Sequence, residues 1–321
     1  MVNDRLERKG CAAGAPAARG PPFLPIVLWY YFIYESRDER EEAALASSEF
    51  TVRFWGVRGS IACPGPTTMR YGGNTSCVEV RCGGRLFIFD GGSGLRLLGN
   101  ELMKGGHPRD FDLFYTHTHL DHCHGLPFFA PCYDARNRIR VWAGHLKPDT
   151  GIAAVLGKMM APPLFPIPMD IFAAKLDFND FVAGELLQPQ PGVTLRTGLL
   201  NHPNRATGYR LEHDGKAVTY ITDTEHDPGQ LDPSVLRLVD RADLMIYDCT
   251  YTDEEYPAHR HWGHSTWQEG VRLANAAQVK TLVLFHHDPD HDDSFMDRIA
   301  AEAAVARPGT LVAHEGLVLR L

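Results

Sequence analysis

From Phe50 to the C-terminus, short apolar runs rich in β-branched and aromatic residues alternate with turn clusters and a few longer amphipathic stretches. Such runs bounded by turn residues are typical of strands, whereas the longer stretches indicate helices. The strands predicted in this way are residues 86–90, 111–116, 139–144, 193–200, 217–223, 244–248, 281–286 and 311–321. Helices are predicted at residues 150–160, 233–240, 265–278 and 294–306. The pattern therefore predicts an α/β domain.

Two local signals add detail to this pattern. Ser265 followed by Gln268 has the spacing of a capping box and predicts a helix that begins there. Residues 161–170, APPLFPIPMD, contain four prolines, each of which lacks the backbone donor that a helix interior or a central strand requires. We expect this segment to be a surface excursion near a site or an interface.

The first 49 residues differ in composition from the rest. They contain a twelve-residue apolar run, FLPIVLWYYFIY, interrupted by Pro25 and followed by a charged run. Twelve residues are too few to span a bilayer. We expect residues 1–49 to be a poorly ordered N-terminal extension with no membrane role, and residues 50–321 to be one folded domain. An export signal or a membrane-surface anchor is the alternative for the apolar run.

Composition narrows the class of function. The chain has 321 residues, of which 44% are hydrophobic, enough for a sizeable core, and its net charge is −8. An acidic chain has no overall positive field that attracts polyanions, so binding to long nucleic acid is the less expected outcome. Its seven cysteines are irregularly spaced and include no C-x-x-C pair, which favours a reduced, cytoplasmic setting.

Histidines and aspartates gather just past the ends of the predicted strands. The residues in these positions are Asp90, His117, His202, Asp223, Asp248 and His286. Side chains at the ends of neighbouring strands meet at one edge of a sheet, so we expect them to share one cleft.

The segment LFYTHTHLDHCHGLP, residues 113–127, carries the strongest chemical signal. In an extended segment alternate side chains share a face, so His117, His119 and Asp121 would point the same way, with His122 turned aside. Imidazole and carboxylate groups are ligands for zinc and related ions. The arrangement suits two metals, with further ligands drawn from His202, Asp223 and either His286 or His287.

These residues carry a family resemblance. THTHLDHCHG, the later His202, Asp223 and His286, and the earlier FDGGSGLR resemble the metallo-β-lactamase family. The resemblance covers residues 50–321 and implies a catalytic domain built as a four-layer αββα sandwich. It also implies two divalent metal ions, zinc by preference, with manganese or iron as alternatives. The ligands that it implies are His117, His119 and His202 for the first ion, Asp121, His122 and His286 for the second, and Asp223 as a bridge, with His287 as the rival of His286.

Two later segments indicate a branch of that family. Residues 247–250, YDCT, and 263–266, GHST, resemble the late motifs of RNase Z-like phosphodiesterases, although Tyr247 and Asp248 replace a His-Glu pair and Cys249 replaces alanine. The resemblance implies that His264 protonates the leaving group and that Asp248 holds its ring. Asp121 completes the predicted catalytic set. The shorter reach of aspartate leaves the pairing of Asp248 with His264 to be shown.

The predicted function is hydrolysis of a small phosphodiester, in the first place a 3′,5′-cyclic nucleotide. An RNase Z-like endonuclease that processes tRNA 3′ ends is the first alternative, weakened by the acidic charge and by the lack of a recognisable basic arm. A non-catalytic sensor of metal or nucleotide is the second. The resemblance also implies a homodimer. Two roles stay open for a group of aromatic and histidine side chains, a wall on which a base stacks or an ordinary lid: Tyr251, Tyr256, His259, His261 and Trp262.

Overall fold

The computed structural model describes residues 50–105 and 109–321. The chain divides into two units, residues 1–43 and 44–321, and the following account concerns the second. The predicted N-terminal extension, residues 1–49, lies outside the described residues. None of the helices in the described part of the chain is long and apolar enough to cross a membrane.

Seven strands form the first sheet, in the order β14-β1-β2-β3-β4-β5-β6. β1, β2 and β3 pair antiparallel, whereas β3, β4, β5 and β6 run parallel, so that Phe89 lies opposite Phe114. The strands are β1 (Thr51–Gly56), β2 (Cys77–Cys82), β3 (Arg85–Phe89), β4 (Asp110–Tyr115), β5 (Arg138–Ala143), β6 (Lys175–Asp180) and β14 (Val318–Arg320).

The second sheet also has seven strands, in the order β13-β12-β11-β10-β9-β8-β7. β10 to β13 run parallel and β7 to β10 antiparallel. All residues of β11 are buried, as expected for a parallel strand that is covered on both faces. The strands are β7 (Leu186–Gln190), β8 (Val193–Leu200), β9 (Ala206–His213), β10 (Lys216–Ile221), β11 (Leu244–Asp248), β12 (Thr281–Phe285) and β13 (Leu311–Val312).

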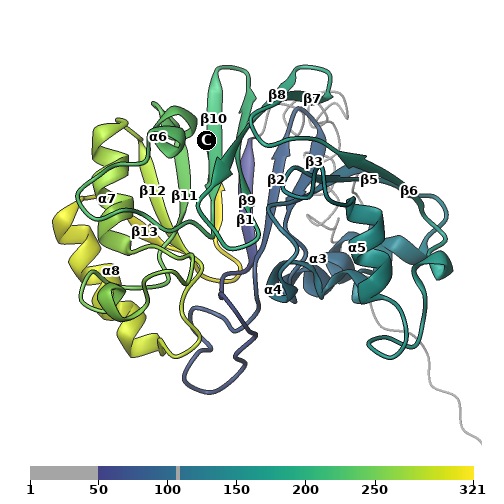
Figure 1. The fold of residues 1–321 in the computed structure, drawn as a ribbon, viewed down its shortest axis with the longest axis horizontal. Coiled ribbons are helices and arrows are strands. Elements are labelled where there is room, and N and C mark those ends of the chain that lie inside the picture. The colour runs from purple at the N-terminus through teal and green to yellow at the C-terminus, as the bar shows by residue number, and fades with distance from the viewer. Residues whose placement is uncertain (1–49, 106–108) are drawn as a thin grey trace, which may run out of the picture. The chain divides into compact units, whose positions relative to one another are not determined.

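The two sheets face each other across an aromatic core. Phe114 of the first sheet stacks on Phe89 at 5.5 Å between ring centroids and meets Tyr209 of the second sheet edge-on at 5.7 Å. α3 (Gly94–Leu102) and α5 (Ile152–Met159) cover the outer face of the first sheet. α6 (Pro233–Val239), α7 (Trp267–Ala276) and α8 (Asp293–Ala306) cover the second (Figure 1). This confirms the predicted four-layer αββα arrangement.

Several short elements lie in the connections. α4 (Leu120–Cys123) follows β4 inside the histidine-rich segment. The remaining turns are the 3₁₀ helices η1 (Leu126–Phe128), η2 (Ala130–Tyr133), η3 (Met169–Ile171) and η4 (Tyr256–Ala258). In the Pro-rich excursion, Leu164 is 77% exposed, which agrees with the predicted surface position.

Two local predictions were wrong. Residues 311–321 form two strands rather than one, because the turn at residues 314–317 carries the chain from β13 in the second sheet to β14 in the first. The N-cap of α7 is Thr266, whose side chain accepts a hydrogen bond from the backbone N–H of Glu269 at 3.1 Å. The capping interaction is therefore one residue beyond the Ser265–Gln268 pair.

Candidate metal centre

The polar residues at the strand ends come together, and both sheets contribute to the cluster. His117 follows β4 of the first sheet, whereas His202, Asp223 and His286 follow β8, β10 and β12 of the second. The sequence predicted one cleft at one sheet edge. The residues do gather in one cluster, but this cluster lies where the ends of two facing sheets meet.

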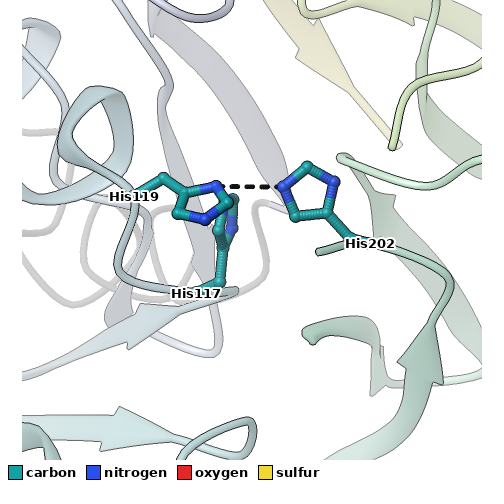
Figure 2. A group of neighbouring side chains, drawn as sticks. All are labelled: His117, His119 and His202. Atoms are coloured by element: carbon teal, nitrogen blue, oxygen red, sulfur yellow. Dashed lines mark hydrogen bonds between the residues drawn. The ribbon is translucent and has the colours of Figure 1, made fainter. Parts of the chain in front are cut away.

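One group of donor atoms consists of three imidazoles, His117, His119 and His202. Nε2 of His117 and Nε2 of His202 each lie 3.0 Å from Nδ1 of His119 (Figure 2). Two of these rings come from the segment after β4 and the third comes from the opposite sheet. Three ring nitrogens turned toward one point form a suitable ligand set for a divalent ion.

A second group combines two carboxylates and two imidazoles, those of Asp121, His122, Asp223 and His286. Nε2 of His122 lies 3.3 Å from Nε2 of His286 and 3.2 Å from Oδ2 of Asp121. Asp121 reaches this group because it lies in the first turn of α4. The prediction that Asp121 shares an extended face with His117 and His119 was wrong, since the extended segment ends at His119.

Asp223 lies between the two groups. Its Oδ1 is 3.2 Å from Nε2 of His122 and 3.2 Å from Nε2 of His286. Its Oδ2 is 3.7 Å from Nε2 of His117 and 3.6 Å from Nε2 of His202. Each carboxylate oxygen therefore faces one group, which is the geometry of a bridging ligand. The cluster as a whole is consistent with a binuclear metal site.

Asp90 orients the imidazole of His122 through the ring nitrogen that faces away from the second group. Its Oδ2 lies 2.8 Å from Nδ1 of His122 and accepts a hydrogen bond from the hydroxyl of Tyr220 at 3.0 Å. Its Oδ1 accepts the backbone N–H of Thr116 at 2.8 Å. With Nδ1 protonated toward Asp90, Nε2 of His122 presents its lone pair to the cluster, as a metal ligand requires.

The rings of His202 and His286 are oriented in the same way. Nδ1 of His202 donates to the carbonyl of Gly263 at 2.7 Å, and Nδ1 of His286 lies 3.0 Å from the hydroxyl of Thr250. The outer nitrogen of each ring is thus occupied, and Nε2 points inward. Such outer contacts fix the tautomer of a ligand before any ion binds.

The buried carboxylates of the cluster create a negative potential that positive charge would balance. Burial acts to lower the pKa of His122, but the carboxylates of Asp223, Asp121 and Asp90 outweigh it and raise this pKa well above its usual range. Burial acts to raise the pKa of Asp223, but the neighbouring imidazoles hold it well below its usual range. The carboxylates are therefore ionised in a buried place, where divalent cations would neutralise them.

Backbone conformation also positions the cluster. Asp90, Asp223 and His286 adopt left-handed φ angles of 61°, 57° and 61°, which are uncommon for residues with a Cβ and concentrate at functional sites. The loop after β1 lies against the same residues. The N–H of Ser60 donates to Oδ2 of Asp121 at 2.8 Å, and a Cβ at Gly59 would come within 2.4 Å of the His286 ring. The contact between Ser60 and Asp121, which are 61 positions apart, has no signal in the sequence.

His264 and Asp248 form the predicted pair. Nδ1 of His264 lies 3.1 Å from Oδ2 of Asp248, so the shorter aspartate does reach the ring. Burial acts to lower the pKa of His264, but Asp248 by its charge and hydrogen bond raises it to about 9. The same Oδ2 accepts the N–H of Thr224 at 3.1 Å, and Oδ1 accepts the hydroxyl of Thr250 at 2.8 Å. The carboxylate is thus fixed from several directions.

Tyr247, which departs from the family pattern, supports the same region. Its hydroxyl lies 2.9 Å from Oγ of Ser265, and Nδ1 of His226 lies 2.8 Å from that oxygen on another side. Ser265 directly follows His264 and is fully buried. The tyrosine therefore holds the backbone on which His264 is mounted.

Three residues of the histidine-rich segments lie outside the cluster. Nε2 of His287 bonds the carbonyl of Ala313 at 2.8 Å, which places His286, and not its rival, among the donor atoms. The Nδ1 of His124 bonds the carbonyl of Leu120 within the same short helix. Cys123 is buried, and burial raises the pKa of its thiol to about 12, which leaves it a packing role.

Comparison with known proteins identifies the family. The sequence profile of the beta-lactamase superfamily domain matches residues 87–287, more than half of the chain. The chain belongs to the β-lactamase superfamily. Its two sheets with flanking helices have the metallo-β-lactamase fold.

Among similar proteins is the ribonuclease Z of Haloarcula marismortui, 25% identical over 319 residues, which cover 84% of this chain and 96% of that protein. Two solved structures share the fold. The metallo-β-lactamase fold protein YhfI of Bacillus subtilis has a TM-score of 0.64 at 18% identity, covering 85% of this chain and all of that one. The short form of human tRNase Z has a TM-score of 0.59 at 21% identity, covering 84% of this chain and 98% of that one. The chain is thus distantly related to RNase Z.

Proposed function

We propose that this protein is a two-metal phosphodiesterase. The observation that carries the proposal is the position of Asp223 between two groups of donor atoms, together with the His264–Asp248 pair beside them. Two adjacent ions suit phosphodiester hydrolysis because the substrate is anionic and both its attacking and leaving oxygens need stabilisation.

The donor set defines which residues would hold the ions. His117, His119 and His202 would bind the first ion, and Asp121, His122 and His286 the second, with Asp223 shared by both. Imidazole and carboxylate ligands suit zinc, and manganese or iron would be accepted by the same set.

The chemistry divides between the ions and the side chains. When bound, the two ions supply Lewis acidity toward the phosphoryl group and acidify water. Asp90, Thr250 and the carbonyl of Gly263 keep the ligand rings in their binding orientation. His264 holds a proton on the side of the cluster beside His202 and Asp223, and Asp248 stabilises its protonated form. We assign to His264 the transfer of this proton to the departing oxygen.

For the substrate, the relatives favour RNA. Proteins named ribonuclease Z match this chain over most of their length, including that of Kineococcus radiotolerans at 27% identity over 279 residues. We therefore propose an RNase Z-like endonuclease acting near the 3′ end of an RNA as the first candidate. This reverses the order expected from sequence, where the cyclic nucleotide stood first.

A 3′,5′-cyclic nucleotide is the second candidate. The observation that favours it is the net charge of −8, which gives a long polyanion no overall attraction. A non-catalytic sensor is the weaker alternative, because the complete set of seven donor residues comes together in the structure. A homodimer and a cytoplasmic location stay predictions. Analytical ultracentrifugation would check the homodimer.

The deciding experiment offers one metal-loaded preparation several substrates. A precursor tRNA with a 3′ extension, cyclic mononucleotides and cyclic dinucleotides would be compared with the same protein after chelation. Cleavage of the precursor at its 3′ end, lost after chelation, is the expected result. Hydrolysis of cyclic nucleotides alone would establish the second candidate, and nucleotide binding without turnover would establish the sensor.

A further inference from the structure

The loop that leads into His264 exposes a tryptophan. It runs from η4 to Gly263, and Trp262 in this loop is 60% exposed, whereas the other tryptophans among the described residues are buried or half-buried. Single exposed apolar side chains are common and carry no meaning by themselves. Trp262 differs from such side chains because hydrogen bonds hold its loop in place and because the loop contacts the cluster.

The loop is held in place by a carboxylate. Oε1 of Glu225 accepts the backbone N–H of His261 at 2.8 Å, and Oε2 accepts that of Gly263 at 2.9 Å. His261, the first of these two anchors, adopts a left-handed φ of 72°, and Trp262 lies between the anchors. Gly263 in turn lies against His202, to which its carbonyl is bonded at 2.7 Å. A segment fixed on both sides of its exposed ring has the character of a platform rather than of a mobile lid.

Ring contacts connect Trp262 with the proposed acid. The Trp262 ring meets His259 edge-on at 5.1 Å between centroids, and His259 stacks on Tyr251 at 4.3 Å with 15° between the ring planes. Tyr251, which is buried, meets His264 edge-on at 6.1 Å. Trp262 and His264 are two residues apart, so their Cα atoms are at most about 7.6 Å from each other. The exposed ring therefore belongs to the loop that leads into His264 and is connected to His264 by ring contacts through His259 and Tyr251.

We propose that Trp262 is a stacking platform for a nucleobase next to the scissile phosphodiester, and that it makes the site select nucleotides over phosphodiesters without a base. This inference rests on the proposed function and names the recognition element of the same site. Every base has a π-face, and stacking on an aromatic side chain contributes a factor of about 5 to 150 in affinity per base. Neighbouring Arg260 is exposed and adds positive charge to the same loop.

The test compares ligands with and without a base. Isothermal titration of the metal-loaded protein with adenosine 5′-monophosphate and with ribose 5-phosphate measures the contribution of the base directly. We expect adenosine monophosphate to bind about 5- to 150-fold more tightly. Trp262→Leu keeps an apolar side chain but has no π-face. This variant should bind adenosine monophosphate only as tightly as ribose 5-phosphate, and its affinity for ribose 5-phosphate should be unchanged. Trp262→Phe should keep most of the preference.

Tryptophan fluorescence supplies a second measurement. Adenosine monophosphate should quench the fluorescence of the unsubstituted protein, and Trp262→Phe should abolish this quenching. Trp55→Phe is the matched control, because Trp55 is half-buried and donates to Glu79 away from the cluster. It should keep both the quenching and the affinity. Equal binding of the two ligands, no binding of adenosine monophosphate, or an unchanged preference in Trp262→Leu would overturn the proposal.

Hydrolysis of bis(p-nitrophenyl) phosphate by the same preparations separates this inference from the proposed function. Hydrolysis without preference for a base would contradict the platform and leave the phosphodiesterase intact. A preference for the base without hydrolysis of any phosphodiester would contradict the phosphodiesterase and leave the platform intact.

Discussion

Nδ1 of His264 lies 3.1 Å from Oδ2 of Asp248, and the donor atoms of this buried pair lie close to those of His202, Asp223 and His286, although we assign the pair to proton transfer and not to the metal ligands. A proton on His264 is therefore stabilised where a leaving oxygen would need it. The arrangement separates two tasks, the binding of metal and the transfer of a proton, and substitutions can test them one at a time.

Replacing the proposed acid should impair turnover and spare the metals. In His264→Ala we expect turnover of a phosphodiester with a poor leaving group to fall about 10²-fold or more, the usual scale for a lost general acid. The metal content, measured by plasma mass spectrometry, should stay at that of the parent. With bis(p-nitrophenyl) phosphate, whose leaving group needs no proton, the loss should be smaller. An equal loss on both substrates would remove His264 from this role.

Two histidines of the same short segment should behave in opposite ways. His122 faces the cluster, whereas His124 bonds the carbonyl of Leu120. We expect His122→Gln to lose bound metal and activity, and the matched control His124→Gln to keep both. Metal analysis of the two purified variants checks this directly. If both variants lost metal equally, the assignment of the second group of ligands would not stand.

The carboxylate behind His122 should affect metal affinity without contacting metal. Asp90→Asn weakens the hydrogen bond that fixes the Nδ1–H tautomer of His122, and we expect a 10- to 100-fold loss of metal affinity, measured by competition with a chelator. Asp214→Asn, whose side chain is 82% exposed in the β9–β10 turn, is the control and should leave the affinity unchanged. An unchanged affinity in Asp90→Asn would show that this contact is only structural.

How far the sequence predicts this molecule depends on how local each signal is. The motif from His117 to His122 is specific because its chemistry is crowded into six positions, and it indicated the fold and the cluster. Strands with charged residues were missed, such as β2, CVEVRC, and β6, KLDFND, because their apolar pattern is too weak to recognise. The helix α3 was missed for a related reason, since it follows the glycine-rich turn without a side-chain cap.

Contacts between distant segments could not be predicted at all. The N–H of Ser60 reaches Asp121 across 61 positions, and the fully buried Arg58 reaches two carbonyls more than 200 positions away. Neither the hydrophobic periodicity nor the spacing of residues in the sequence indicates such pairs. The left-handed backbone conformations of Asp223 and His286 could not be predicted from the sequence either, because tertiary structure and not residue type imposes them.

Arg58 should be important for stability through these distant contacts. Its guanidinium donates to the carbonyls of Gly72 at 2.8 Å, Asp288 at 3.0 Å and His291 at 2.7 Å. Arg58→Met would leave these acceptors without their donor, and we expect a loss of about 2–4 kcal/mol in the free energy of unfolding. Arg70→Gln is the control in the same loop. Its exposed ion pair with Asp297 should contribute little.

Denaturant unfolding of both variants, with metal present at the same concentration, checks this prediction. A stability of Arg58→Met equal to that of Arg70→Gln would contradict it.

The measurement that tests the central claim most directly combines metal counting with a choice of substrates. Purified protein is stripped with a chelator, reloaded with zinc, manganese or iron in separate samples, and offered bis(p-nitrophenyl) phosphate and a thioester. The two groups of donor atoms predict two equivalents of bound metal and hydrolysis of the phosphodiester that disappears on stripping and returns on reloading. Cleavage of the thioester while the phosphodiester survives, with any metal, would contradict the account.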